Sequence, residues 1–399
     1  MRIEIPKLSD RLGSNMFYGI QKIYELDGGT HIDPEFDSPF HVIRQTDPEQ
    51  IQAIERDMAI VIPVKNERLR VLEGVLCGIP HHCIPIIVSG SDRSPVDRFT
   101  MEQRMIDAFC NYAKKAYVCV HQQSEIIAQA FTNAGYKYLL DDENGLVRPG
   151  KAEGMIVGLL LARLLGKKYI GYIDADNYFP GSVLEYVRIF SAGLSQGVSP
   201  FKMVRIQWHS KPKIDGDELF FARWGRVSRI TNQFLNQLMA CFTGFETDAL
   251  KTANAGEHAM SMELAMALDY SSGFSIETYH FINLFEKFGG ILPGGTSEFL
   301  AKGVEIFQIE SRNPHFHDIE KGTSHLNGMI ESSLSVIYHT PLCPEALKKE
   351  IQDFLYQTGI TQQKCAPCLP TCYPAMEGIN VALAQKKMDW AAISNLSFK

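Results

Sequence analysis

The chain has 399 residues, 45% of them hydrophobic, so it can bury a large core. Its 39 Lys and Arg residues are scattered and are outnumbered by 46 Asp and Glu residues, which argues against a nucleic-acid-binding surface. The sequence has neither the apolar core of a signal peptide nor an apolar run of about 18 residues that could span a membrane. We therefore expect a cytoplasmic protein that acts on a small molecule, with no nucleic-acid or membrane partner.

Short apolar runs alternate with amphipathic stretches from Met58 onward, a pattern typical of βα units on a parallel sheet. The runs are continuous and partly β-branched, as in strands buried on both faces. The predicted strands cover residues 58–63, 83–89 and 116–121, and the predicted helices between and after them cover 67–76, 96–114 and 124–133.

The next βα unit has the clearest pattern. Residues 151–166 predict an apolar helix that ends at a glycine, and residues 169–176 predict a buried strand after it. Pro180 is suited to the first turn of a further helix. Residues 201–208 predict another strand, and residues 227–239 another helix.

These elements give an α/β fold with one large domain. We predict an N-terminal decoration packed on the main sheet over residues 1–55 and a catalytic domain over residues 56–340. Within that domain, residues 56–200 are expected to bind a nucleotide and residues 201–340 the second substrate. Residues 341–399 are predicted to form a helical appendage and an irregular tail.

Two carboxylates lie at the end of the strand predicted at residues 169–176, in the sequence Asp174-Ala175-Asp176. In parallel α/β sheets, ligands bind beyond the carboxyl ends of the strands. Two carboxylates spaced by one residue can there share a divalent cation bound to a diphosphate. The alternative is that the two side chains only end the strand and cap the next helix.

Two other strands also end in small or polar residues. Residues 63–67, PVKNE, open the first predicted helix, where backbone N–H groups can face a nucleotide. Ser89 ends the second strand in the sequence SGSD, which allows close approach of a base or ribose. The alternatives are that Glu67 is an ordinary first-turn residue and that Ser89 lies in an ordinary loop.

Lys151 stands at the predicted start of the apolar helix, after the sequence RPG. The dipole of a helix favours anions at its N-terminus, so a lysine there is unfavourable unless an anion lies nearby. A bound diphosphate would remove this conflict. A solvated lysine is the alternative.

The nine cysteines do not predict a disulfide framework, because most stand singly in apolar runs. Three lie close together near the C-terminus, at Cys365, Cys368 and Cys372, with Cys343 as the nearest fourth thiol. Free thiols are the main interpretation, and a structural zinc site is the alternative.

The ordered motifs PVKNE, SGS, RPGKAEGM and YIDADNYFPG resemble those of the mannosyl-3-phosphoglycerate synthases, retaining glycosyltransferases of the GT-A fold. The resemblance continues through KMVRIQW, WGRVS, TGFET, NAGEH, GFSIE and GVEIFQIESRNPHFH and covers roughly residues 58–340. It implies a mixed, mostly parallel central sheet flanked by helices. It also implies transfer of mannose from GDP-mannose to 3-phosphoglycerate, which gives 2-O-mannosyl-3-phosphoglycerate and GDP on the route to the compatible solute mannosylglycerate.

The resemblance also implies roles for individual residues, which fall into donor, metal, acceptor and sugar groups. The donor would be bound by Pro63, Lys65, Asn66, Glu67 and Ser89 around guanosine, and by Lys151, Asp174, Ala175 and Asp176 around the diphosphate. The metal would be bound by Asp176 and by His317 or His315. The acceptor would be bound by Gly225, Arg226, Val227 and Ser228, together with the loop of Gly256, Glu257 and His258. Lys151, Asp174, Asp176 and Glu277 would be catalytic, with Glu277 near the sugar hydroxyls.

In the mechanism that the resemblance implies, the leaving phosphate accepts the proton of the acceptor hydroxyl, and Glu277 is not a covalent nucleophile. The expected cofactor is Mg²⁺, with Mn²⁺, Co²⁺ or Zn²⁺ as alternatives, and a homodimer is the default assembly. A related glucosyl-3-phosphoglycerate synthase would use UDP-glucose or GDP-glucose in the same way. A nucleotidyltransferase would need a glycine-rich loop after the first strand, where this chain has no glycine until Gly74. A non-catalytic sensor would be expected to lose the two carboxylates or the acceptor motif, and both are present.

Overall fold

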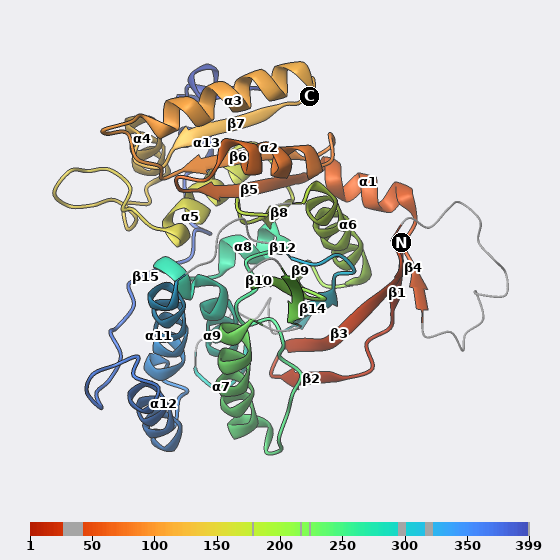
Figure 1. Ribbon diagram of the computed structural model, residues 1–399, viewed down its shortest axis with the longest axis vertical. Coiled ribbons are helices and arrows are strands. Elements are labelled where there is room, and N and C mark those ends of the chain that lie inside the picture. Colours follow the sequence, from red (N-terminus) through yellow and green to blue (C-terminus); the bar gives the residue numbers. More distant parts are fainter. Residues whose placement is uncertain are drawn as a thin grey trace.

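The computed structural model describes residues 1–26, 43–177, 179–215, 218–222, 225–293, 301–315 and 322–397. Within them, twelve strands form one sheet, seen in Figure 1. In spatial order these are β16 (Ser394–Asn395), β7 (Tyr117–His121), β6 (Ile84–Ser89), β5 (Met58–Val64), β8 (Tyr169–Tyr172), β12 (His258–Ser261), β9 (Phe201–Gln207), β14 (Val304–Glu310), β3 (Asn15–Glu25), β1 (Arg2–Glu4) and β4 (Ile43–Gln45), with β2 (Ser9–Leu12) on β3.

The sheet is mixed, as expected. β7, β6, β5 and β8 are parallel neighbours, and β14 is parallel to both β9 and β3. β12 runs antiparallel between β8 and β9, and the outer strands pair antiparallel. The predicted α/β class is confirmed, and the carboxyl ends of β5, β6 and β8 come together at one edge of the sheet.

Both faces of the sheet are buried because alternate residues of each strand point to opposite sides. In β5, Met58, Ile60 and Ile62 enter one core while Ala59 and Val61 enter the other. The first core is covered by α1 (Pro48–Arg56), α2 (Leu69–Gly78), α3 (Arg98–Tyr112) and α6 (Pro180–Gln196). The second is covered by α4 (Glu125–Ala134), α5 (Lys151–Leu164), α7 (Arg226–Thr243), α8 (Met262–Ala267), α9 (Ile276–Phe288), α11 (Thr323–His339) and α12 (Glu345–Gln357), of which α7, α9, α11 and α12 stand side by side in Figure 1.

Helix α5 is almost entirely interior, with twelve of its fourteen residues buried. Gly158 allows this close packing, because a Cβ there would come within 2.3 Å of the Val61 side chain on β5. The helix ends at Leu164, and Gly166 adopts a left-handed conformation with φ of 72°, as the glycine stop signal predicted. The inward face of α5 thus fixes the position of Lys151 at its start.

The predicted strand at residues 169–176 was too long. β8 ends at Tyr172, which pairs with His258 on one side and Val61 on the other. Beyond that point the chain leaves the sheet, so Asp174 and Asp176 lie in the loop that follows the strand. The apolar run continues because Ile173 and Ala175 are also buried.

The N-terminal part was expected to pack on the sheet as a decoration, but it extends the sheet. β3 pairs along β14 in parallel, and its burial alternates residue by residue between Asn15 and Lys22. This is the period of a half-buried strand. Residues 27–42 lie outside the described part of the chain.

The C-terminal part is helical in α12 and α13 (Val381–Lys387), as predicted, and the rest of its described residues are mostly irregular apart from two short strands. β15 (Cys372–Tyr373) pairs with β13 (Tyr270–Ser271), and β16 joins the sheet edge beside β7. The η2 turn (Trp390–Ala392) precedes β16, and the remaining two-stranded sheet joins β10 (Lys211–Asp215) to β11 (Glu218–Ala222). The tail therefore crosses from the α11 and α12 side to the opposite edge.

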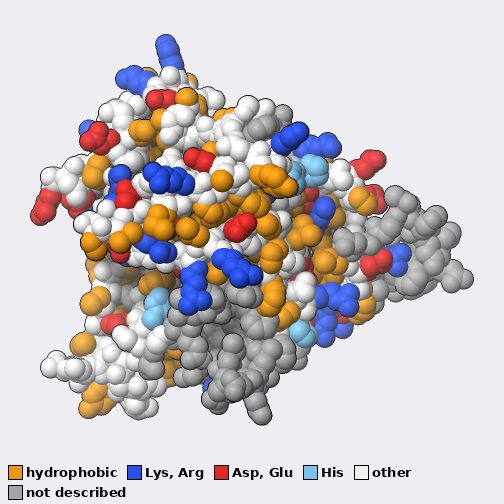
Figure 2. Space-filling model, turned by 45° about the horizontal axis from the view of Figure 1, so that its top comes forward, with side chains coloured by type: hydrophobic (Ala, Val, Ile, Leu, Met, Phe, Trp, Pro, Cys, Tyr) orange, Lys and Arg blue, Asp and Glu red, His pale blue; other side chains and the backbone are white. Residues whose placement is uncertain are grey.

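Among the described residues, no helix combines the length and the apolar character needed to cross a membrane. On the face drawn in Figure 2, Lys and Arg side chains are interspersed with acidic and hydrophobic ones rather than gathered in one area. This face thus agrees with the scattered charge in the sequence.

Candidate active site

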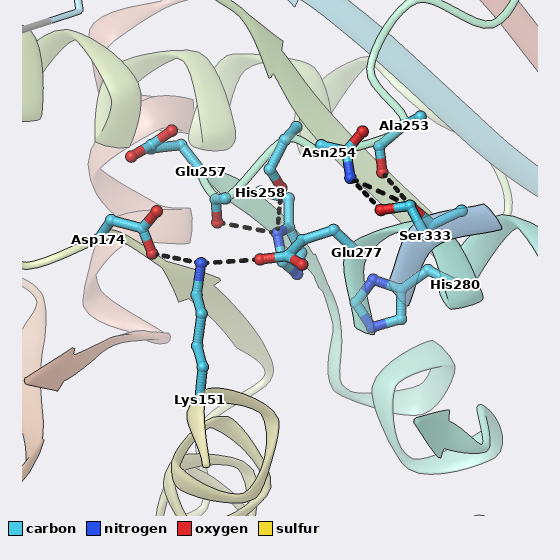
Figure 3. Close-up of polar contacts among 12 residues, drawn as sticks. Lys151, Asp174, Ala253, Asn254, Glu257, His258, Glu277, His280 and Ser333 are labelled. Atoms are coloured by element: carbon cyan, nitrogen blue, oxygen red, sulfur yellow. Dashed lines mark hydrogen bonds and ion pairs between the residues drawn. The ribbon is translucent and has the colours of Figure 1, made fainter. Parts of the chain in front are cut away.

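Three charged side chains from distant parts of the chain meet beyond the end of β8 (Figure 3). The Nζ of Lys151 lies 2.7 Å from Oδ1 of Asp174 and 2.8 Å from Oε1 of Glu277. Lys151 begins α5, Asp174 follows β8, and Glu277 lies in the first turn of α9. The structure thus brings together three of the four predicted catalytic residues.

Burial by itself lowers the pKa of Lys151, but the two carboxylates outweigh this effect and raise that pKa above its ordinary value. Lys151 is therefore a permanent cation at neutral pH. Its one positive charge faces two negatively charged carboxylates. The group can therefore bind a further cation, or an anionic ligand can replace one carboxylate beside the ammonium.

The side chain of Glu257, labelled in Figure 3, is completely buried and belongs to a second polar cluster. The side-chain amide of Asn177 donates to its Oε1 at 2.9 Å and the indole of Trp208 to its Oε2 at 2.9 Å. Asn177 also donates to the backbone oxygen of Asp174 at 2.8 Å. These contacts join the loop after β8 to the loop before β12.

Gly256 lies against the carboxylate of Asp174. A Cβ at this position would come within 2.4 Å of Asp174 Oδ2, so only glycine fits without displacing the carboxylate. The predicted sugar and acceptor loop therefore touches the loop of the two carboxylates directly.

At the ends of β5 and β6, the predicted guanosine residues bond to the loop after β6 and to the start of α3. Asn66 has a φ of 58°, its backbone N–H donates to Ser91 Oγ at 2.7 Å, and its side chain exchanges hydrogen bonds with Asp92. Pro63 is half-buried at the end of β5, Lys65 is exposed, and the backbone oxygen of Glu67 accepts from Arg98 at 2.7 Å. The left-handed residue makes a sharp turn after β5.

Ser89 is fully buried at the end of β6, and its hydroxyl donates to Glu102 at 2.6 Å. The hydroxyl of Ser91 donates to the other oxygen of Glu102 at 2.7 Å. The Ser89 hydroxyl therefore holds the loop in shape, and the neighbouring backbone is the part that can face a base.

The predicted acceptor residues form the start of α7. Gly225 is the N-cap, Val227 and Ser228 are buried, and the helix begins at Arg226, whose side chain lies outside the described part of the structure. A pocket adjoins this helix start and is lined by Ile206, Gln207, Trp208, Gly225, Ser228, Lys251, Thr252 and Ala255. A helix N-terminus with adjacent basic side chains suits a phosphate.

His258 lies in the core rather than at a surface. Its Nδ1 is 3.0 Å from the backbone oxygens of both Ala255 and Gly256, so this nitrogen carries the proton. Burial, aided by the nearby Arg205, lowers the pKa of His258 well below its ordinary value, which leaves the ring neutral. The histidine thus supports the loop that carries Gly256.

The metal prediction named Asp176 with His315 or His317. Asp176 is 7% exposed, and Ala175 beside it is in the core. His315 is buried, with its ring stacked 4.6 Å from that of Trp208 and its Nδ1 3.3 Å from the hydroxyl of Tyr186. His317 lies outside the described residues.

Glu185 of α6 anchors the segment that leads to these histidines. Its buried carboxylate accepts from the backbone N–H groups of Arg312 and Asn313 at 2.5 and 2.9 Å, and from the Asn313 side chain at 2.7 Å. Among the described residues, no three side chains of His, Cys, Asp or Glu approach closely enough to hold a metal ion.

The same finding removes support for a zinc site at the C-terminal cysteines. Cys365, Cys368 and Cys372 are exposed free thiols, and Cys343 is buried apart from them. All nine cysteines are free, in agreement with the main interpretation of the sequence.

Sequence reasoning missed Arg205, which is completely buried in β9. Its guanidinium donates to the backbone oxygens of Thr252 at 2.8 Å, Ala253 at 3.2 Å and Glu277 at 2.9 Å. It thus ties the loop before β12 to the start of α9. A charged residue inside the apolar run KMVRIQW was the signal that could have identified it.

Comparisons with known proteins show which family this chain resembles in sequence and which solved structure it resembles in fold. Residues 5–388 match the family model described as mannosyl-3-phosphoglycerate synthase. The chain is 42% identical to the mannosyl-3-phosphoglycerate synthase of Pyrococcus furiosus, over 91% of both chains, and 33% identical to that of Aeropyrum pernix, over 92% of both. Its fold is similar to that of a solved glucosyl-3-phosphoglycerate synthase from Mycobacterium tuberculosis, crystallised with Mn²⁺, UDP-glucose and phosphoglyceric acid. That match has a TM-score of 0.50 and 18% identity and covers 76% of this chain and 86% of the other.

Proposed function

The chain belongs to the mannosyl-3-phosphoglycerate synthase family and is a glycosyltransferase, and from this membership we propose its substrates and the role of each site residue. The proposed reaction moves mannose from GDP-mannose to 3-phosphoglycerate with retention of configuration. The products are 2-O-mannosyl-3-phosphoglycerate and GDP, on the route to mannosylglycerate.

The observation that carries this proposal is the position of the Lys151 ammonium between Asp174 and Glu277 at the end of β8. A diphosphate that enters beyond the strand ends meets this cation at the N-terminus of α5. Lys151 then stabilises negative charge on the leaving GDP, which is the main electrostatic demand of the reaction.

A divalent metal fits the residues next to this lysine. Asp174 and Asp176 supply carboxylate oxygens, the donors that hard cations such as Mg²⁺ prefer, and we assign a histidine of residues 315–317 as the third protein ligand. When bound, the metal neutralises charge on the leaving diphosphate. Stacking of His315 on Trp208 favours His317 for this role.

The phosphate of the acceptor is assigned to the start of α7, beside the small pocket there. The lining of this pocket includes Ser228 and Lys251 at a helix N-terminus, and Arg226 belongs to the same turn. A phosphate and a carboxylate on one small acceptor match this concentration of donors. The loop of Gly256 and Glu257 lies between this pocket and Asp174.

Glu277 is assigned to the sugar hydroxyls rather than to a covalent intermediate. Its Oε1 already forms an ion pair with Lys151 at 2.8 Å, and this neutralisation reduces the nucleophilicity of the carboxylate. In this scheme the leaving phosphate accepts the proton of the acceptor hydroxyl, and the acceptor attacks from the same face.

A coupled assay with GDP-mannose, 3-phosphoglycerate and Mg²⁺ tests the proposal, with mass analysis of the product. We expect a phosphorylated mannosyl glycerate that disappears when EDTA is added and returns with excess Mg²⁺. Parallel assays with UDP-glucose and GDP-glucose test donor choice. A higher kcat/KM for either glucose donor would overturn the assignment of GDP-mannose while leaving the fold and the acceptor intact.

The preference for Mg²⁺ over Mn²⁺, Co²⁺ or Zn²⁺, the homodimer and the cytoplasmic location are part of the same proposal. Metal preference is tested by titrating each ion into metal-free enzyme with GDP present. Sedimentation analysis of the purified chain tests the homodimer.

A further inference from the structure

The C-terminal strand β15 lies against the segment that leads into α9. In the ladder between them, Tyr373 pairs with Tyr270 and Cys372 with Ser271 of β13, and Ser272 N–H donates to the backbone oxygen of Thr371 at 2.9 Å. The chain then passes through the turn η1 (Gly273–Ser275) directly into α9, whose second residue is Glu277. The tail thus fixes the position at which α9 begins.

The side chain of Tyr373 reaches the other helix of the ion pair. Its hydroxyl donates to Oε1 of Glu153 at 2.8 Å, and the two residues are 1% and 3% exposed. Glu153 is the third residue of α5, two positions after Lys151. One strand of the tail therefore contacts both elements that carry the Lys151 and Glu277 side chains.

Glu153 is placed to control the first turn of α5. Its carboxylate folds back toward the N-cap residue Gly150. A Cβ on Gly150 would come within 1.9 Å of Glu153 Oε2, so the glycine is required for this close approach. Gly150 directly precedes Lys151, and a shift of the Glu153 carboxylate would therefore move the backbone from which Lys151 projects.

The Glu153 carboxylate depends on its partners because it is buried. Burial raises the pKa of Glu153, and the hydroxyl of Tyr373 with the backbone N–H groups of Glu153 and Gly273 opposes that rise. Loss of the hydroxyl would leave a buried carboxylate short of a donor, and such groups reorganise to recover one.

We propose that Tyr373 is a positioning residue for the transferase reaction: through Glu153 it fixes the first turn of α5 so that Lys151 stays between Asp174 and Glu277. This inference rests on the proposed function, because it concerns the lysine assigned to the diphosphate. It gives a role to the C-terminal tail, for which the sequence supplied no chemical motif.

The chain offers a matched control in Tyr136. This residue is 3% exposed, and its hydroxyl donates to the backbone oxygen of Pro374 at 2.6 Å, next to Tyr373 in the same tail. Tyr136→Phe and Tyr373→Phe each remove one buried hydroxyl and one hydrogen bond to or from the tail. Only the second removes a contact with α5.

The test compares kcat, both KM values and the thermal unfolding midpoint for the two variants, at a temperature well below either midpoint. We expect Tyr373→Phe to lower kcat about 10-fold with the KM for 3-phosphoglycerate unchanged, because a small misplacement of a charged group costs about this much or more. Tyr136→Phe is expected to lower the midpoint to a similar degree with kcat within about 2-fold of the wild type. Equal kcat values for the two variants would overturn the inference.

A double-mutant cycle separates positioning from general destabilisation. If Tyr373 acts through Glu153, adding Tyr373→Phe to Glu153→Ala should cause no further loss of kcat, whereas independent effects would multiply and refute the mechanism. If Tyr373→Phe folds poorly, Glu153→Ala alone still tests the mechanism, because a wild-type kcat in that variant would refute it. Absence of mannosyl transfer by the wild type would instead contradict the proposed function, and the cycle would then be run with the donor that the wild type uses.

Discussion

At the nucleotide end of the site, beyond β5 and β6, hydrogen bonds join residues that are close in the sequence, whereas at the sugar end they join distant ones. Ser89 and Glu102 are 13 positions apart and Asn66 and Ser91 are 25 apart. By contrast, 80 positions separate Asn177 from Glu257, and 127 separate Glu185 from Arg312.

The two ends also differ in charge. In the nucleotide loops, serine hydroxyls and the Asn66 amide bond to the carboxylates of Glu102 and Asp92. The sugar end instead places the Lys151 ammonium between the carboxylates of Asp174 and Glu277. A nucleoside is recognised by a complementary surface and neutral hydrogen bonds. A leaving diphosphate is stabilised by charged groups held in fixed positions. Changes at the sugar end should therefore affect kcat, and changes at the nucleotide end should affect donor affinity.

The largest effect is expected for Asp176→Ala at the sugar end. Loss of this carboxylate removes a proposed metal ligand, and kcat should fall about 1,000-fold or more. The fold should persist, as measured by circular dichroism and thermal unfolding. A variant with normal activity in Mg²⁺ would contradict the metal assignment and with it the charge difference between the two ends.

Glu185→Gln should have the next largest effect, although Glu185 is proposed to touch no substrate. Replacing one carboxylate oxygen by an NH₂ group sets a donor against the donors of Arg312 and Asn313 and loosens the histidine segment. We expect an affinity for Mn²⁺, measured by calorimetry with GDP bound, about 10-fold or more below that of the wild type.

Glu310→Gln is the control for Glu185→Gln, because this carboxylate pairs with the half-exposed side chain of His209 at 3.4 Å. Its Mn²⁺ affinity should equal that of the wild type. Equal losses in both variants would show that Glu185 has no special role in ordering the segment.

A smaller effect is expected at the nucleotide end, from Ser89→Ala. This change removes one donor from the buried Glu102 and loosens the loop after β6. The Kd for GDP should rise about 2- to 10-fold, while kcat at saturating donor stays the same. A fall in kcat with unchanged donor affinity would break the comparison between the two ends.

Glu55→Gln should leave kcat unchanged and affect stability only. Burial, opposed by Arg188 at 3.1 Å, raises the pKa of Glu55 to about 7 from its ordinary value of 4.5. Between these values the folded protein binds a proton that the unfolded chain does not, so the free energy of unfolding falls as pH rises through this window. The decrease is up to about 3 kcal/mol.

The Glu55→Gln variant should therefore lose less stability than the wild type between pH 5 and pH 8, measured by urea unfolding. The same pH dependence in both proteins would show that Glu55 is ionised throughout this range.

The sequence predicted the fold well wherever local patterns decide it. The continuous apolar runs placed β5, β6, β7 and β9 to within one residue of their bounds, because buried parallel strands leave an unambiguous signal. The N-terminal strands were missed as part of the sheet, since only pairing with β14, nearly 290 positions away, gives β3 its place.

The candidate site shows the same limit. The motifs around Lys151 and Asp174 identified the charged centre, because they occupy strand and helix ends that the periodicity had already located. Arg205, Glu185 and Tyr373 could not be assigned, since each acts through contacts with segments far away in the sequence. Their burial is also a property of the fold, which no local pattern reports.

The position of β15 after all the residues proposed to contact a substrate has a consequence for biosynthesis. A polypeptide is made from its N-terminus, so every side chain proposed to contact a substrate leaves the ribosome before Tyr373 does. A nascent chain that has emerged only through α12 thus holds all of these residues but lacks the strand that fixes Lys151. A chain truncated just after α12 should therefore keep a complete set of the proposed substrate-binding residues and turn over more slowly than a chain that includes β15.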